Sequence, residues 1–97
     1  METICLTGDY PKEEIQSVLQ DAVQRQTEMV RARFTQFEAD CRAFEETYGM
    51  TSDSFLARFE AGELGDDPQW FDWFAAAKGK RSWEKKLWIL QGLKWIP

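Results

Sequence analysis

The sequence contains no histidine, and its 97 residues include only two cysteines, Cys5 and Cys41. Without imidazole and without a CxxC pair, thiolate and imidazole zinc sites, cysteine–histidine nucleophiles and serine–histidine–aspartate triads are excluded. Cys41 lies on an apolar helical stripe and Cys5 alternates with apolar residues. We therefore interpret both as small hydrophobic residues and not as redox groups.

Long hydrophobic runs are also missing. No stretch of about 18 apolar residues occurs, and the start METICLTGDYPKEE lacks the basic region and apolar middle of a signal peptide. We expect no transmembrane segment and a cytoplasmic location. The hydrophobic content is nevertheless 43%, with five Trp and seven Phe, which predicts a folded chain. At this length we expect a single domain, residues 1–97, with a thin core that a partner helps to complete.

Charge is distributed unevenly along the chain. Residues 1–49 hold five basic and ten acidic side chains, and residues 50–77 hold one basic and six acidic side chains. Residues 78–97 hold six basic side chains and one acidic side chain. An acidic body binds nucleic acid poorly but suits a basic protein surface, because opposite potentials steer the encounter and fix its register. The composition therefore favours a protein partner.

Residues 11–48 are expected to form one helix of about 38 residues, because no proline or glycine occurs between Pro11 and Gly49. Asp9 or Tyr10 is expected to cap the helix and Pro11 to occupy its first position. Gly49 is expected to end it in a left-handed turn. The only polar interruption of its apolar stripe lies around Gln26.

A helix of this length reaches about 57 Å, whereas a compact chain of this size is little more than about 30 Å across. Either a second copy or another protein covers half of the helix, or the helix breaks near Gln26 and folds into a hairpin. We favour a homo-oligomer, a dimer in the simplest case, within a helical bundle. Its interface is predicted at the positions with 4-3-4-3-4 spacing: Val30, Phe34, Phe37, Cys41, Phe44 and Tyr48. An ordinary intramolecular core is the alternative for the same stripe.

The rest of the chain is also predicted to be helical, which makes the fold all-α. A short helix is expected at about 52–61, capped by Thr51, and a helix or helix pair at about 67–92, opened by Asp67 and Pro68. Residues 1–10 form an N-terminal arm. Its first eight residues alternate like a short strand, although an ordinary frayed terminus explains them equally well.

The acidic helical corner at residues 49–77 contains the stretch GELGDDP. Gly62 and Gly65 are expected to stop one helix and turn the backbone, and Asp66 and Asp67 to meet the free amides of the next helix. A metal site or an acid–base pair is the alternative, but no D-x-D-x-D-G loop is present. We therefore assign no catalytic residue, no metal ligand and no cofactor, and expect a protein that is not an enzyme.

Capping alone does not explain so many carboxylates beside aromatic residues. We interpret the corner as a docking surface for a basic, apolar-lined groove of a partner. The predicted partner-binding residues are Glu63, Asp66, Asp67, Trp70, Phe71 and Trp73.

The run YGMTSDSFLARFEAGELGDDPQWFDW, residues 48–73, resembles a pattern of small bacterial and archaeal proteins with a GELGDD core that follows a long helix. Such proteins are often encoded beside a small toxin of the TumE type and are then interpreted as antitoxins in a TumA-like role. The resemblance implies a cytoplasmic member of a type II toxin–antitoxin pair, which neutralises its cognate toxin by direct binding. This chain departs from the pattern in its tail, where Gly79 and Ser82 are expected to interrupt the last helix and three additional tryptophans occur.

The basic aromatic tail, residues 78–97, supports an alternative function as a nucleic-acid or membrane-surface binding module. Its predicted contacts are Lys78, Lys80, Arg81, Lys85 and Lys86. The simpler interpretation, which we prefer, places Trp83, Leu87 and Leu90 over the phenylalanine stripe of the long helix, while the lysines face water or pair with glutamates of that helix.

Overall fold

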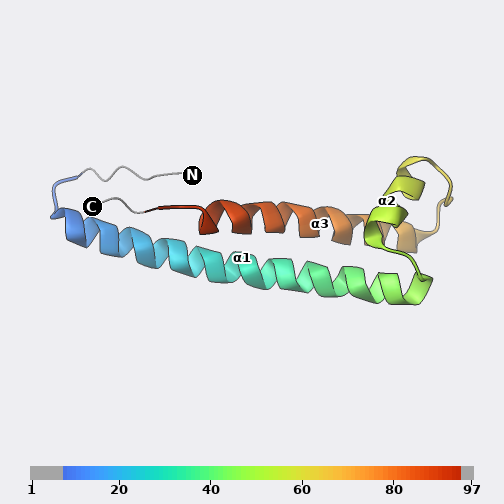
Figure 1. Ribbon diagram of the computed structural model, residues 1–97, viewed down its shortest axis with the longest axis horizontal. Helices are drawn as coiled ribbons and strands as arrows, with labels where there is room; N and C mark the ends of the chain where they lie inside the picture. The colour runs from blue at the N-terminus through green and yellow to red at the C-terminus, as the bar shows by residue number, and fades with distance from the viewer. Residues whose placement is uncertain (1–7, 95–97) are drawn as a thin grey trace.

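A computed structural model describes residues 8–94 as an elongated all-α molecule (Figure 1). These residues form α1 (Lys12–Tyr48), α2 (Ser52–Glu60) and α3 (Pro68–Gln91). α3 runs back along α1, and α2 lies at the end of the rod where α1 finishes and α3 begins (Figure 1). The rod measures 59 × 21 × 18 Å. The predicted all-α fold is confirmed, whereas the strand pattern predicted for residues 1–8 lies, except for Gly8, outside the described residues.

The long helix α1 is unbroken over 37 residues, so the hairpin alternative is wrong. The polar gap around Gln26 causes no break, and there the Thr27 hydroxyl donates a hydrogen bond of 2.7 Å to the Val23 carbonyl one turn earlier. Gly49 ends the helix in the left-handed region at φ 67°, as predicted. The predicted N-cap is wrong: Pro11 occupies that position, and no side chain caps the helix.

Three helices meet around Trp73, whose side chain is fully buried. The ring stacks on Phe55 of α2 with 4.1 Å between the centroids and 4° between the planes, and it also stacks on Phe44 and Tyr48 of α1. Its indole Nε1 donates a hydrogen bond of 2.9 Å to Ser52 Oγ. One side chain therefore joins all three helices, with its single polar atom satisfied.

The start of α2 is held by two side chains. Thr51 Oγ1 accepts a hydrogen bond from the Ser54 amide at 3.1 Å, which confirms the predicted cap. Glu45 of α1 reaches across the turn, and its Oε2 accepts a hydrogen bond from the Ser52 amide at 2.7 Å. A carboxylate at a helix N-terminus satisfies a free N–H and opposes the positive end of the helix dipole. Glu45 therefore fixes α2 relative to α1.

The last helix, α3, continues through Gly79 and Ser82 to Gln91. The predicted interruption is therefore wrong, and residues 68–91 form one helix and not a helix pair. Gly79 has a packing role instead. A Cβ atom at this position would lie 2.7 Å from Cε1 of Phe37, which is closer than two carbons can approach. The missing side chain lets α3 lie against the phenylalanine ring of α1, despite the low helix propensity of glycine.

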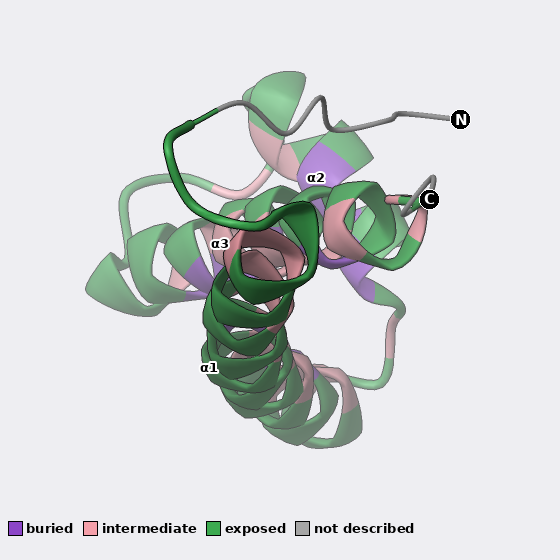
Figure 2. Cartoon of the chain, turned by 90° about the vertical axis from the view of Figure 1, so that its left-hand side faces the viewer, coloured by how far each residue is buried: buried purple, intermediate pink, exposed green. Residues whose placement is uncertain are grey.

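Burial is concentrated at the end of the rod that holds α2. The core there consists of Cys41, Phe55, Leu56, Trp73, Ala76 and Ala77. Towards the other end the buried hydrophobic residues are Val30 and Leu87, and between Lys12 and Met29 no residue of α1 is buried. In Figure 2, which looks along the rod from that end, the nearest turns of α1 are coloured as exposed or intermediate. Residues 8–94 therefore cover one end of the long helix much better than the other.

Replacing Gly79 by leucine tests the close contact between α1 and α3. Leucine is a much better helix former than glycine, so a purely local effect would stabilise the protein. We expect the opposite, a loss of about 2 kcal/mol or more in the free energy of unfolding, because the side chain is forced onto Phe37. The measurement is urea unfolding followed by circular dichroism. The matched control is Ser82→Leu at an exposed position of α3; equal stability of the two variants would show that no contact limits position 79.

Replacing Ser52 by alanine tests the hydrogen bond that Trp73 makes in the core. The indole N–H then loses its acceptor, and we expect the free energy of unfolding to fall by about 1–3 kcal/mol. Ser54→Ala, at an exposed position of the same helix turn, is expected to change it by less than about 0.5 kcal/mol. Tryptophan fluorescence during urea unfolding measures both variants. A similar small change in both would argue against a structural role for the bond.

Candidate protein-docking surface

The GELGDDP turn has the architecture predicted for it. Gly62 has φ 75° and Gly65 has φ 79°, both in the left-handed region that glycine favours. The Gly62 amide donates to the Phe59 carbonyl and the Glu63 amide to the Arg58 carbonyl, which is the hydrogen-bond pattern of a Schellman ending of α2. Most of the motif therefore shapes the turn between two helices.

The predicted partner-binding residues have different environments in this corner. Asp67 accepts a hydrogen bond from the Gln69 amide at 3.0 Å and so caps α3. Glu63 lies 3.6 Å from the Nε of Arg58, while Asp66 is exposed. Phe71 is 54% exposed, and its ring packs edge-on against the ring of Phe59 with 5.4 Å between the ring centroids. Of the three predicted aromatic contacts, Phe71 is therefore an exposed side chain in the acidic corner.

Two of the predicted aromatic contacts belong more to the fold than to the surface. Trp73 is fully buried, so its assignment as a partner-binding residue is wrong. Trp70 is half-buried and packs on Tyr48 with 4.8 Å between the ring centroids. Trp70, Phe71 and Trp73 lie within one turn of helix, so their spacing alone does not separate them. The positions of α1 and α2 decide which of them is covered.

The predicted oligomer interface on α1 is used within the chain. Val30 and Cys41 are each 1% exposed, and Phe34, Phe37, Phe44 and Tyr48 are half-buried. Trp73 stacks on two members of this stripe, and α3 covers it along much of its length. Within one chain the stripe therefore packs as the intramolecular alternative describes, and its role as an oligomer interface stays a prediction.

A groove that sequence reasoning missed lies between α1 and α3. It measures about 470 Å³, and its described lining residues are Phe37, Asp40, Ala43, Phe44, Asp72, Ala75 and Ala76. Small and aromatic side chains make its walls apolar, and each helix adds one aspartate. The spacing Asp72-Ala75-Ala76 was visible in the sequence, but nothing local indicates that Asp40 of α1 stands opposite.

The carboxylates of this region differ in whether they have a cationic partner. Glu38, Asp53, Glu60 and Glu63 each lie within 4.0 Å of a lysine or arginine nitrogen. Within residues 8–94, Asp40, Asp66 and Asp72 take part in no ion pair. We call the groove together with Phe71, which lies four residues before Ala75 on α3, the acidic face. Its aspartates can form ion pairs with a bound partner without first breaking an ion pair within the chain.

The basic segment of α3 makes several contacts within the chain. Lys78 lies 3.5 Å from Glu60, and Arg81 lies 3.2 Å from Asp53. Lys86 is placed over the ring of Trp83, 4.3 Å from its centroid. Lys80 is half-buried, and Lys85 is exposed. Both ion pairs join α3 to α2 and not to glutamates of α1, the partners that the simpler interpretation of the tail predicts.

Cys41 lies in the core next to Ser52. Burial raises the pKa of the Cys41 thiol above its ordinary value of 9.0, and a hydrogen bond from the Ser52 side chain opposes this only in part. Because the native state holds this proton more tightly than the unfolded state does, the contribution of the thiol to stability is present below pH 9.0 and falls as the pH rises above it.

Within residues 8–94, no group of three or more His, Cys, Asp or Glu side chains is placed to hold a metal ion. None of the helices in this part of the chain combines the length and the apolar character that crossing a bilayer requires. Comparison of the chain with models of protein families, with curated proteins and with solved structures finds no match.

The buried position of Cys41 predicts a thiol that reacts only when the protein opens. In a Cys5→Ser variant, in which Cys41 is the only thiol, we expect Ellman's reagent at pH 8 to react at least about 100-fold more slowly than in denaturant. The absorbance of the released thiolate measures the rate. A native rate close to the denatured rate would mean that the thiol is accessible and that the core at Ser52 is open.

Proposed function

We propose that this chain is a non-catalytic protein-binding module that docks a basic partner protein on its acidic face. The observation that carries the proposal is the groove between α1 and α3, where Asp40 and Asp72 stand on an apolar wall without an ion-pair partner among the described residues. An arginine or lysine side chain suits such a groove, since its aliphatic stem contacts the apolar wall and its charged end meets the carboxylates.

The exposed ring of Phe71 extends the same surface. It lies four residues before Ala75 of the groove, and residues at this spacing are neighbours on one side of a helix. Aromatic side chains contribute strongly at protein interfaces when a partner covers them. A partner with a basic residue flanked by an apolar side chain therefore has contacts for both of its groups.

The proposed class of partner is the cognate toxin of a type II toxin–antitoxin pair. This proposal comes from the resemblance of residues 48–73 to proteins encoded beside TumE-type toxins. The acidic face supports it, since a toxin that acts through a basic surface is blocked by an acidic protein that covers it. Neutralisation by direct binding in the cytoplasm requires no catalytic group and no cofactor from this chain.

Charge reversal on the groove tests the proposal. The partner in the experiment is the protein encoded by the reading frame adjacent to the one for this chain, co-expressed and purified with it. For Asp40→Lys combined with Asp72→Lys we expect the dissociation constant to rise at least about tenfold, because like charges then face each other across the interface. Both aspartates are exposed, so the melting temperature should change little. Calorimetric titration measures the affinity.

The matched control is Asp21→Lys combined with Glu28→Lys, which makes the same change of charge at exposed positions of α1 outside the acidic face. It should leave the affinity within about a factor of two, since exposed charges far from a contact are screened by salt. Equal weakening by both pairs would reduce the effect to net charge. No co-purification of the wild-type chain with the adjacent product would remove the antitoxin proposal.

A further inference from the structure

The two ends of the rod differ in how completely the helices are covered. At one end α2 packs on α1 and α3 and closes a core around Trp73. At the other end α1 and α3 lie side by side as a single layer, and no residue of α1 before Val30 is buried (Figures 1 and 2). In a layer of two helices each helix is covered on one face only, so apolar side chains on its other faces remain in contact with water.

Exposed large hydrophobic side chains collect at the end that lacks α2. Six such residues occur among the described residues, and five of them belong to the first half of α1 with its preceding turn or to the last turns of α3. These five are Tyr10, Val18, Met29, Trp88 and Ile89. The sixth, Phe71, belongs to the acidic face. The half of the rod that lacks α2 therefore exposes more large apolar side chains than the half that holds it.

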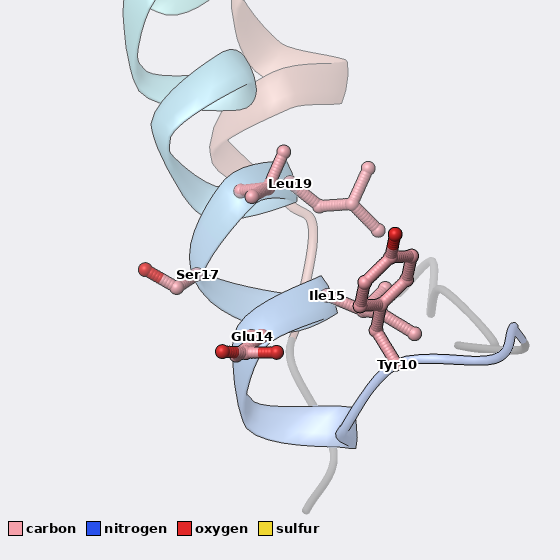
Figure 3. Close-up of a pocket in the computed structure, with 6 residues that line it drawn as sticks. Tyr10, Glu14, Ile15, Ser17 and Leu19 are labelled. Carbon is pink, nitrogen blue, oxygen red and sulfur yellow. The ribbon is translucent and has the colours of Figure 1, made fainter.

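The beginning of α1 also carries an open apolar cleft of about 580 Å³. Figure 3 shows Tyr10, Ile15 and Leu19 on one side of the first turns of the helix, with the tyrosine ring beside the isoleucine, while Glu14 and Ser17 point away from them. Four of the six described residues that line the cleft are apolar, and its one carboxylate is that of Glu14, whereas the groove has two. The cleft therefore suits an apolar partner.

Charge indicates which partner fits this end. Residues 34–81, which include the acidic face, carry ten acidic and five basic side chains. Residues 8–33 and 82–94 together carry six acidic and seven basic side chains. Two copies that met through their acidic ends would repel each other, while two nearly neutral ends meet without that cost. The neutral apolar end can therefore face a second copy of itself.

The surface area of the chain is large enough for such a contact. The chain exposes 7003 Å², whereas a compact chain of 11.4 kDa exposes about 5,800 Å². The excess of about 1,200 Å² is larger than the roughly 800 Å² that each partner contributes to an interface of standard size. The elongated shape that produces this excess area also gives a large radius of gyration, 19.0 Å against about 12.5 Å for a compact chain.

We propose that two copies of this chain associate through the ends that lack α2. In this dimer the first half of α1 and the last turns of α3 from each copy form a four-helix layer around a two-fold axis. The apolar side chains of Val18, Met29 and Ile89 contribute to its core. The acidic faces lie at the two outer ends of the dimer. The dimer does not depend on the proposed toxin partner.

The test uses the full chain in solution. Sedimentation equilibrium is expected to give twice the chain mass of 11.4 kDa. Small-angle scattering is expected to give a maximum dimension greater than the 59 Å of one rod, because the copies overlap only in part. A mass of one chain at all concentrations overturns the proposal, and so does a dimer no longer than a single rod, which would mean association along the whole length.

Substitutions at exposed positions assign the surface without disturbing the core. Val18→Glu combined with Ile89→Glu is expected to raise the dimer dissociation constant at least about tenfold, since charged groups would be buried without partners. Phe71→Glu is the matched control, because Phe71 is exposed to a similar extent as Ile89, 54% against 51%, but lies on the acidic face. Circular dichroism verifies that every variant is folded. Dissociation by Phe71→Glu but not by the Val18 and Ile89 substitutions would place the interface at the opposite end and contradict the proposal.

Discussion

The buried indole of Trp73 joins the three helices at one end of the rod. It stacks on Phe55 of α2, lies against two aromatic rings of α1 and donates its only polar hydrogen to Ser52. α2 is only nine residues long, and a helix of that length is marginal in water without tertiary packing. The fixed position of α2 therefore follows from this aromatic stack together with the cap supplied by Glu45.

Features set by neighbouring residues could be predicted from the sequence. Gly49, Thr51, Gly62 and Asp67 each act on backbone groups within a few residues, so the letters alone determine their roles in ending or starting a helix. Features set by the approach of two helices could not be predicted in this way. Helix propensity alone predicts a break at Gly79. In the structure Gly79 lies against the Phe37 ring, and α3 can approach α1 this closely because position 79 has no side chain.

The candidate site shows the same division. The sequence indicates an acidic, aromatic corner, and Asp66 and Phe71 are indeed exposed there. It does not indicate that Asp40, more than thirty residues earlier in the chain than Asp72, lines the same groove. It also assigns Trp73 to the surface, because the side of α3 that α1 covers depends on how the helices are rotated against each other and not on composition.

The length of α1 sets a constraint that the chain only partly meets by itself. With α2 and α3 together providing 33 residues of helix, the chain completes a three-helix core at one end and leaves two helices side by side at the other. The stripe from Val30 to Tyr48 is the part that α2 and α3 cover best, so the surplus apolar surface lies towards the start of α1. Association through that end is compatible with docking on the acidic face, because a contact at one end of the 59 Å rod leaves the other accessible.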